Sequence, residues 1–350
     1  MPKPCGPRPS RKVVLLTIGG VRRQETFSQR GLVNIPHLFN ELLPQSLFYP
    51  YIANEGTTSH FISIASMLTG VWQHVDDWGN DEPANPTLFH YLQSQLGCHP
   101  NETWVVTSNK QLTGKIAVGS NVILAKQFLI EAVERIIQGR SSREKLDRDA
   151  LLRELVSLLD QDYERIGWDM PFPSAILDPG VKRTLVQGLN QFIHGPEAPA
   201  TGDELTFFIA SEVLKQVKPA LLMMNFTDVE VAHAGVWSLH LGGIRRFDRL
   251  CARLWKFLQT DPEYAGRTTF VIVPEFGRDP DGSSTNGFFN HRTNTESCRL
   301  TWMMVLGQAV RRHEVVERVV RHIDVAPSLG GLFGVECRQA KGEPLKEFAV

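Results

Sequence analysis

The sequence of 350 residues lacks an excess of charge of either sign and lacks any long hydrophobic run. It carries 37 lysines and arginines against 38 acidic residues, which gives a formal net charge of −1. A broad basic field of the kind that holds nucleic acid is therefore excluded, because phosphate binding needs clustered positive charge. No apolar run approaches the roughly 20 residues that a helix needs to cross a membrane. We therefore expect neither a nucleic-acid partner nor a membrane.

Cysteine is scarce, and its spacing has no recognisable pattern. There are five cysteines, an odd number, and no two of them form a CxxC motif. They are Cys5, Cys98, Cys251, Cys298 and Cys337. This usage indicates a reducing compartment and argues against both a disulfide framework and a cysteine zinc site. The apolar run that follows the basic, proline-rich residues 1–12 is too short for a signal peptide. We expect a disordered tail over residues 1–12 and a cytoplasmic protein.

Short apolar runs bounded by turn residues are present instead. They are Val13–Ile18, Trp104–Thr107, Ala220–Phe226, Thr269–Pro274 and Trp302–Leu306. Such runs are typical of strands that are buried on both faces of a sheet. Helical patterns such as Leu241–Gln259 lie between them, and this alternation predicts an α/β three-layer sandwich with a mostly parallel central sheet. Sites in such sheets form at the carboxyl ends of the strands, which directs attention to Gly19, Asp228 and Glu275.

The middle of the chain differs from both flanks. From about Val122 to Val217 the pattern is mostly helical and rich in charge, with prolines and a glycine-rich loop near its end. We expect a helical cap over residues 121–215, inserted between the two parts of an α/β core at residues 13–120 and 216–350. The cap is either a plain structural insertion or a lid over the substrate. An insert of this size is also a candidate interface for a homo-oligomer.

Four segments and a late motif occur in a fixed order along the two flanks. They are VVLLTIGGVR at Val13–Arg22, the stretch Asn34–Gly70 that ends in SMLTG, ALLMMNFTDVEVAHAG at Ala220–Gly235, TFVIVPEFGRDPDGSSTNGFFNHR at Thr269–Arg292, and RHIDVAPSLGGLFG at Arg321–Gly334. This order resembles the alkaline phosphatase superfamily of phosphatases, sulfatases, nucleotide pyrophosphatases and related mutases. The resemblance covers about residues 13–110 and 215–335 and leaves out the middle. It implies an alkaline-phosphatase-like fold.

The resemblance also implies a metal-dependent ester chemistry. A transferred phosphoryl or sulfuryl group needs an in-line nucleophile and positive charge on its equatorial oxygens. In the family, two metal ions about 4 Å apart supply that charge and lower the pKa of the nucleophile. One ion is held by Asp, His and His, and the other by two Asp, one His and a Thr or Ser nucleophile.

One of the two implied metal sites is degenerate in this chain. The strand-end Asp of the family falls on Gly19, and the family's Asp-His-Gly reads Glu275-Phe276-Gly277. Glycine and phenylalanine offer no ligand, so two of the three non-nucleophile ligands of this site are missing. Glu275 alone would hold a second ion weakly, although it remains a candidate ligand or general base.

The other implied site is better preserved. His233 in AHAG and His291 in FFNHR match the two histidines of the family. The familiar spacing puts the carboxylate four residues before His233, on Val229, and a small shift would bring Asp228 or Glu230 into place. Three protein ligands with an open position are the pattern of a catalytic zinc site. We therefore expect one divalent ion, zinc, at Asp228, His233 and His291, with Glu275 nearby; the alternative is a core histidine and a loop histidine.

The nucleophile position also departs from the family pattern. The family places the nucleophile nine residues before the Thr of its Thr-Gly pair, and that count leads from Thr69 to His60. Thr57 and Thr58 stand just upstream, near an expected helix N-terminus that favours an anion. Together with Ser59 they also suit a helix N-cap. His60 is a candidate metal ligand, phosphate-contacting group or phosphorylated nucleophile.

Two functions follow from these residues. The first is a hydrolase or transferase that acts on a phosphate, phosphonate or sulfate ester with a remodelled, single-metal site. The attacking group would then be a hydroxyl of Thr57 or Thr58, or water. The second is a catalytically inactive family member, a pseudoenzyme, that binds an anionic ligand or a protein partner. Both functions imply a small anionic molecule at the site.

Overall fold

A nine-stranded sheet forms the centre of the computed structural model, which describes residues 9–109, 111–112, 114–117, 120–124, 201–282, 287–308, 310–311 and 313–348. The strands are β1 (Lys12–Ile18), β2 (Leu47–Ala53), β3 (Thr103–Thr107), β4 (Asn121–Leu124), β5 (Leu221–Phe226), β6 (Thr268–Pro274), β7 (Leu300–Gly307), β8 (Glu314–Val315) and β9 (Val320–Arg321). Their order is β4-β3-β5-β1-β6-β7-β2-β8, and β9 also pairs with β2. Only β7 runs antiparallel to its neighbours β6 and β2. The predicted mostly parallel α/β sheet is therefore confirmed.

The central strands are buried on both faces, as their continuous apolar runs predict. Every residue of β1 is buried. Val14 and Leu16 point into one hydrophobic core, and Val13 and Leu15 point into the other, because successive side chains of a strand alternate between the two faces. The five predicted runs correspond to β1, β3, β5, β6 and β7.

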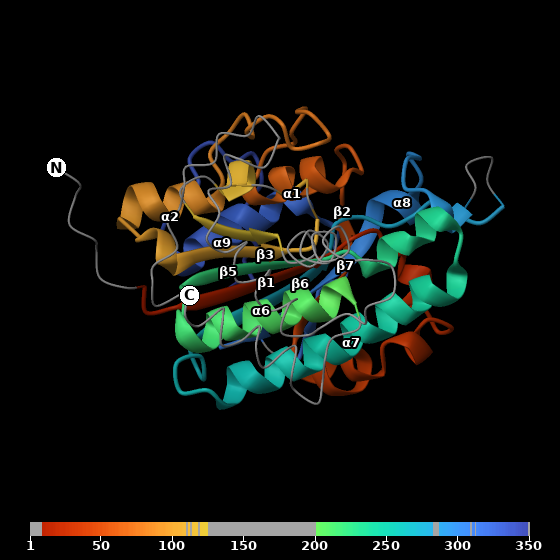
Figure 1. Cartoon of the computed structure of the whole chain (residues 1–350), viewed down its shortest axis with the longest axis horizontal. Coiled ribbons are helices and arrows are strands. Elements are labelled where there is room, and N and C mark those ends of the chain that lie inside the picture. Colours follow the sequence, from red (N-terminus) through yellow and green to blue (C-terminus); the bar gives the residue numbers. More distant parts are fainter. Residues whose placement is uncertain are drawn as a thin grey trace, which may run out of the picture.

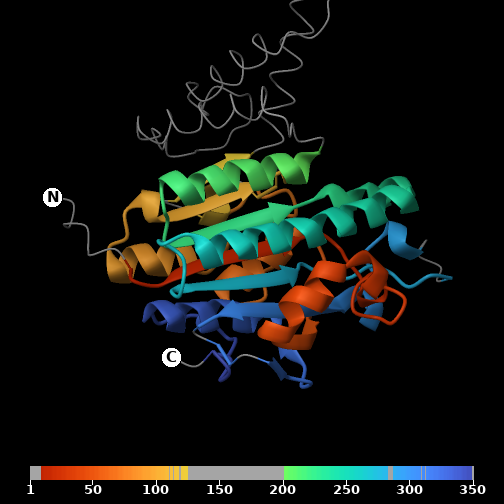
Figure 2. The ribbon, with the colours of Figure 1, turned by 90° about the horizontal axis from the view of Figure 1, so that it is seen from below.

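Helices cover both faces of the sheet. They are α1 (His60–Thr69), α2 (Leu88–Leu96), α6 (Gly202–Gln216), α7 (Trp237–Thr260), the short α8 (Glu296–Arg299) and α9 (Val325–Phe333). In Figure 1, α1, α2 and α9 lie above the sheet while α6 and α7 lie below it, and Figure 2 shows α6 and α7 side by side on their face. The helix α7 presents Leu250, Leu254 and Leu258 to the core at a spacing of four residues, which is one stripe of an α-helix.

Short helical turns connect these elements. They are η1 (Arg23–Glu25), η2 (Leu32–Asn34), the π-turn η3 (Leu38–Leu42), η4 (Leu43–Gln45), η5 (Pro100–Glu102), η6 (Gly114–Ala117), η8 (Asp228–Ala234), η9 (Gly287–Phe289) and η10 (His322–Asp324). Two of them, η8 and η9, follow β5 and β6 at the carboxyl edge of the sheet. None of the described helices is both long enough and apolar enough to span a bilayer.

The structure describes both ends of the predicted cap. They belong to the central sheet and to the helices that cover it. Residues 121–124 form β4, which pairs with β3, and α6 contributes Leu205 and Ile209 to the core that β5 shares. Residues 125–200 and the tail residues 1–8 lie outside the described part of the chain. A lid or an oligomer interface on the cap therefore stays a prediction.

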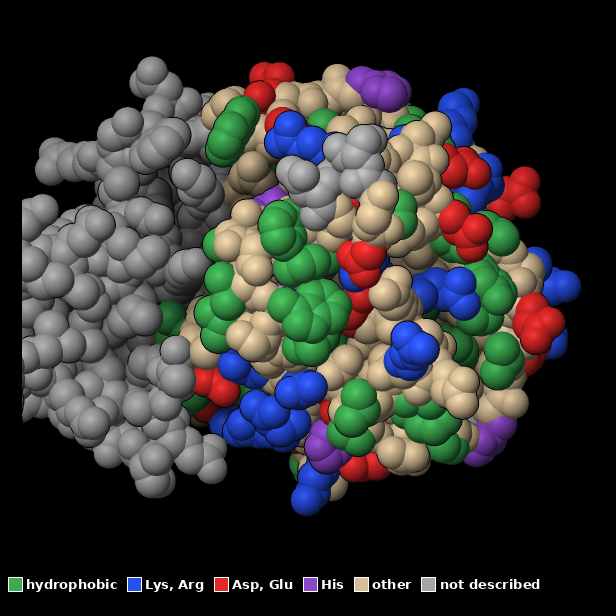
Figure 3. Space-filling model, turned by 90° about the vertical axis from the view of Figure 1, so that its right-hand side faces the viewer, with side chains coloured by type: hydrophobic (Ala, Val, Ile, Leu, Met, Phe, Trp, Pro, Cys, Tyr) green, Lys and Arg blue, Asp and Glu red, His purple; other side chains and the backbone are tan. Residues whose placement is uncertain are grey.

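The strand register brings the expected site positions together. Ile18 at the end of β1 pairs with Phe226 of β5 and with Pro274 of β6. Gly19 and Glu275, which follow β1 and β6, are consequently neighbours at the carboxyl edge, where the Glu275 N–H donates to the Ile18 carbonyl at 2.9 Å. This edge lies on the right in Figure 1, and Figure 3 views the molecule from that side.

Candidate metal centre

Four ligand-type side chains converge at the carboxyl edge of the sheet. His60 is the first residue of α1, Glu230 and His233 lie on η8 after β5, and His291 follows η9. One ligand atom from each lies within 4.8 Å of the other three. The predicted histidines His233 and His291 are thus brought together, and His60 and Glu230 join them.

The geometry of this cluster centres on one oxygen, Glu230 Oε2. It lies 3.0 Å from His233 Nε2, 3.5 Å from His60 Nε2 and 3.8 Å from His291 Nε2, and the Nε2 atoms of His233 and His291 are 3.1 Å apart. Glu230 Oε2 is buried, and its polar neighbours among the described residues are these ring nitrogens. Three imidazole nitrogens and one carboxylate oxygen are a donor set that suits zinc. The residues present therefore fit one divalent ion.

Glu230 fills space that a glycine leaves open. Its Oε1 accepts a hydrogen bond from the Gly20 N–H and forms an ion pair with Arg278 Nη2, both at 2.7 Å. An ideal Cβ on Gly19 would lie only 2.2 Å from that oxygen. The carboxylate that the resemblance leads us to expect at Gly19 is absent, and the Glu230 carboxylate reaches the space beside Gly19 from η8.

The structure does not bring Asp228 into the cluster. Asp228 Oδ2 instead accepts a hydrogen bond from Arg246 Nε at 3.1 Å. The reason is the conformation of η8, a 3₁₀-helix in which side chains three residues apart eclipse one another. Glu230 and His233 have that spacing, whereas Asp228 and His233 do not. The expected carboxylate is therefore Glu230. Its spacing of three residues from His233 is the sequence feature that identifies it.

Glu275 lies beside the cluster and contacts His60, so its roles as a metal ligand or a general base stay predictions. Its side chain is fully buried, and its Oε2 lies 2.7 Å from His60 Nδ1. Its Oε1 accepts a hydrogen bond from Asn225 Nδ2 at 2.5 Å. A carboxylate that accepts from Nδ1–H leaves Nε2 of the imidazole free to bind a metal. Glu275 thus orients His60.

Thr58 orients the other buried histidine. The Nδ1 of His291 lies 2.7 Å from the Thr58 carbonyl, and the Thr58 hydroxyl donates to the His291 carbonyl. Because the Thr58 hydroxyl already donates this hydrogen bond, Thr58 is not favoured as the nucleophile. Thr57 is exposed just before α1, and Ser59 is the N-cap residue but makes no side-chain capping hydrogen bond. A catalytic role of Thr57 stays a prediction.

Burial and neighbouring charges shift the pKa values of the clustered side chains, and the two effects often oppose each other. Burial lowers the pKa of His60, but the carboxylates of Glu230 and Glu275 overcome this and raise it to about 10. Burial raises the pKa of Glu230, yet Arg278 and His60 hold it well below its usual range. For His291, burial together with the charges of His60 and Arg278 lowers the pKa to about 4 against the attraction of Glu230. Glu230 is accordingly a carboxylate and His291 a neutral imidazole.

The region next to Gly19 and Gly20 is filled by protein. The ring of Phe276 stacks on His291 with centroids 4.4 Å apart. An ideal Cβ on Gly20 would lie 3.0 Å from Phe276 Cε2 and 3.2 Å from Arg278 Cγ. Phe276 offers no ligand, as expected. The side chains of Phe276, Arg278 and Glu230 occupy this region together.

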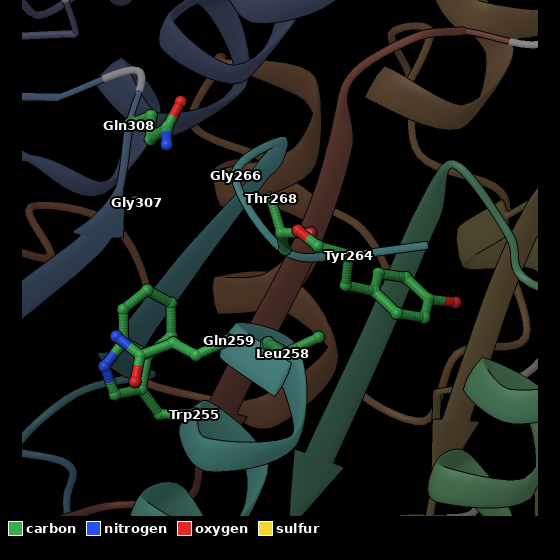
Figure 4. Close-up of a pocket in the computed structure, with 8 residues that line it drawn as sticks. All are labelled: Trp255, Leu258, Gln259, Tyr264, Gly266, Thr268, Gly307 and Gln308. Atoms are coloured by element: carbon green, nitrogen blue, oxygen red, sulfur yellow. The ribbon is translucent and has the colours of Figure 1, made fainter. Parts of the chain in front are cut away.

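A surface pocket of about 320 Å³ lies at the opposite edge of the sheet. It is lined by Trp255, Leu258, Gln259, Tyr264, Gly266, Thr268, Gly307 and Gln308. Figure 4 shows it at the start of β6, where Thr268 and Tyr264 sit, whereas the metal-type cluster lies beyond the end of that strand. None of its lining residues belongs to the cluster.

No protein-family model and no curated protein sequence matches the chain, but solved structures do. The wild-type alkaline phosphatase PafA matches with a TM-score of 0.56 and 11% identity over 97% of this chain and 99% of that chain. A putative sulfatase from Bacteroides thetaiotaomicron gives a TM-score of 0.56 at 10% identity, covering 96% of this chain and 74% of its own. The phosphonate monoester hydrolase SpPMH from Silicibacter pomeroyi gives 0.51 at 12% identity, covering 97% and 76%. At these identities the likeness concerns the fold.

Proposed function

Because the chain has the fold of the alkaline phosphatase superfamily, as its motifs predict, we propose that it is a metal-dependent hydrolase or transferase of phosphate, phosphonate or sulfate esters. The observation that carries this proposal is the convergence of His60, Glu230, His233 and His291, with the buried Glu230 Oε2 among three imidazoles. The cluster lies where sites of such sheets form. One divalent ion, zinc, suits the donor set.

A divalent ion at this position would supply positive charge to the oxygens of a bound ester. The protein's own residues prepare the site for it. Glu275 holds His60 with Nε2 toward the cluster, and Thr58 holds His291 in the same way. His233 is the most open of the four, with 43% of its side chain exposed. The ester therefore approaches from the side of His233.

Two attacking groups remain if His60 is a metal ligand rather than the nucleophile. One is the exposed hydroxyl of Thr57 and the other is water, because the Thr58 hydroxyl is engaged with the His291 carbonyl. The Thr57→Ala variant separates them. Loss of turnover in Thr57→Ala, with metal content unchanged, assigns the attack to the threonine, whereas full turnover assigns it to water.

Metal analysis of the purified protein, paired with turnover of aryl esters, tests the proposed function. The substrates are 4-nitrophenyl phosphate, bis(4-nitrophenyl) phosphate and 4-nitrophenyl sulfate. We expect one equivalent of zinc and turnover of at least one ester, with both lost in His233→Ala. Asp228→Asn is the matched control, since Asp228 lies on the same turn but faces Arg246, and it should keep both. Turnover that survives His233→Ala would contradict the proposal.

The alternative, a catalytically inactive member that binds an anion or a protein partner, is supported by the position of the nucleophile. The family's hydroxyl position holds His60, whose imidazole is engaged with Glu275. Metal-loaded protein that turns over none of the three esters but binds inorganic phosphate or sulfate would favour this function. The cytoplasmic location likewise remains a proposal that rests on the sequence alone.

A further inference from the structure

Arg278 is a charged side chain that the sheet edge encloses completely. It is fully buried, and each of its three nitrogens has a partner within the protein. Nε donates to the Gly20 carbonyl at 2.7 Å, Nη1 to the Phe288 carbonyl at 3.3 Å, and Nη2 lies 2.7 Å from Glu230 Oε1. Enclosing a guanidinium is costly unless a carboxylate pairs with it. Glu230 is that carboxylate.

The position of Arg278 coincides with the degenerate half of the metal site. Gly19 and Gly20 follow β1, and their missing side chains open the space that Glu230 and Arg278 occupy. Glu230 Oε1 is not free for another ion, because it pairs with the guanidinium and accepts a hydrogen bond from the Gly20 N–H. Only Oε2 is left, and it faces the imidazoles.

We propose that Arg278 takes the place of a second cation, so that the site binds one ion and suits monoanionic esters, such as sulfate monoesters and phosphodiesters. The charges of the immediate contacts support this. One divalent ion contributes two positive charges and Arg278 one, against one negative charge each from Glu230 and Glu275. The resulting net charge of +1 matches a monoanion rather than a dianionic phosphate monoester. The neighbouring Asp228–Arg246 pair adds no net charge. The preference among esters depends on the proposed function, whereas the role of Arg278 in metal binding does not.

Titration calorimetry with Zn²⁺ alone tests the role of Arg278 without any turnover. Wild-type protein should bind one equivalent. Arg278→Met should bind it roughly 10–100-fold more weakly, because an outer partner that orients a ligand has an effect of that size. Arg278→Lys, which keeps the charge but not the two-nitrogen geometry, should fall between the two. Arg246→Met removes a neighbouring arginine that pairs with Asp228 and should leave zinc binding unchanged.

Wild-type affinity for zinc in Arg278→Met, or two tightly bound equivalents in the wild type, would overturn the proposal. If Arg278→Met does not fold, Gly19→Ala gives an independent measurement, because its Cβ pushes the Glu230 carboxylate away from the guanidinium. That variant should also weaken zinc binding, and unchanged binding in it would count against the proposal.

Three esters with the same 4-nitrophenyl leaving group test the charge preference. We expect kcat/KM for 4-nitrophenyl sulfate or for methyl 4-nitrophenyl phosphate to exceed that for 4-nitrophenyl phosphate by at least about tenfold, and the faster of the two monoanions separates a sulfatase from a phosphodiesterase. A preference for the dianion would overturn the charge argument and leave the proposed hydrolase intact. No turnover at all, with zinc binding still sensitive to Arg278, would refute the hydrolase and support the role of Arg278.

Discussion

The sharpest prediction concerns moving the carboxylate of the site from position 230 to position 19. The Gly19→Asp variant places a carboxylate on the end of β1, where the family has one, and Glu230→Ala removes the one that η8 supplies. Each single change should weaken zinc binding, and the double variant should bind zinc more tightly than either. This outcome requires that the two positions compete for one space.

The expected size of the effect follows from the geometry. A Cβ on Gly19 would lie 2.2 Å from Glu230 Oε1, whereas ordinary contact begins at 3.4 Å. The carboxylate must therefore move by about 1.2 Å, far more than the roughly 0.2 Å that a metal–ligand distance tolerates. We expect each single variant to lose at least the roughly 10–100-fold in affinity that loss of a supporting group causes.

Titration calorimetry with Zn²⁺ on the wild type, both single variants and the double variant completes the cycle. A tenfold recovery in the double variant, relative to single variants that have each lost at least tenfold, corresponds to a coupling free energy of at least about 2.8 kcal/mol. Gly19→Ala controls for the steric part, since it adds the Cβ without a new ligand. Thermal unfolding confirms that each variant folds. Losses that simply add in the double variant would refute the exchange of carboxylates.

Four further predictions concern single side chains. Glu275→Gln should weaken zinc binding roughly 10–100-fold by releasing His60, and calorimetry that finds unchanged affinity would show that Glu275 does not orient it. Arg278→Met should have a similar effect, as set out above. Burial raises the pKa of Glu347, but the hydrogen bonds from Arg318 and Tyr49 outweigh this and lower it below 4.5, so its contribution to stability is present at neutral pH and lost as the pH falls through the lowered value. Urea unfolding should accordingly show Glu347→Gln less stable than wild type by about 1–3 kcal/mol at pH 7 and closer to wild type near pH 3; an equal deficit at both would contradict this. Leu254→Ala, in the core under α7, should lose about 2–5 kcal/mol in the same assay, and a change below 1 kcal/mol would argue against this packing.

Most of the sheet could be predicted because its strands are buried on both faces. The run VVLLTI of β1 is buried throughout and is apolar at every position except Thr17, so the prediction of a strand does not depend on which face each residue takes. The strand β2, LFYPYIA, was missed because its Pro50 cannot donate to a ladder. The structure tolerates it where the pairing with β7 shifts between Tyr49 and Ile52. That irregularity depends on the neighbouring strand, which the local sequence does not contain.

The histidines of the site could be predicted from their motifs, but the carboxylate could not. His233 and His291 follow recognisable patterns, and the cluster contains both. The choice between Asp228 and Glu230 depends on whether the turn after β5 is an α-helix or a 3₁₀-helix, which has an i, i+3 repeat. The direction of Glu275 depends on Asn225 and His60, which lie on other elements. Such tertiary hydrogen bonds leave no local pattern.

The departures from the family pattern fit together in the structure rather than forming separate losses. Gly19 removes a carboxylate and makes room for Glu230, whose Oε1 would collide with any side chain there. Arg278 then pairs with that oxygen and turns the other toward the imidazoles. His60, at the position of the family's nucleophile, contributes a fourth ligand-type atom and is held by Glu275.

A site that had lost its function would have no reason to keep such an arrangement. Three ring nitrogens lie within 3.8 Å of one buried carboxylate oxygen, which is a donor set that suits a divalent cation. In this cluster the partners of Glu230 Oε1, His60 Nδ1 and His291 Nδ1 are all provided, while Glu230 Oε2 faces only ring nitrogens. This distribution of hydrogen bonds favours a centre that still binds one ion over a site that has lost its metal. Equal zinc affinity in Glu230→Gln and in the wild type would remove the basis of that preference, since the carboxylate would then take no part in holding an ion.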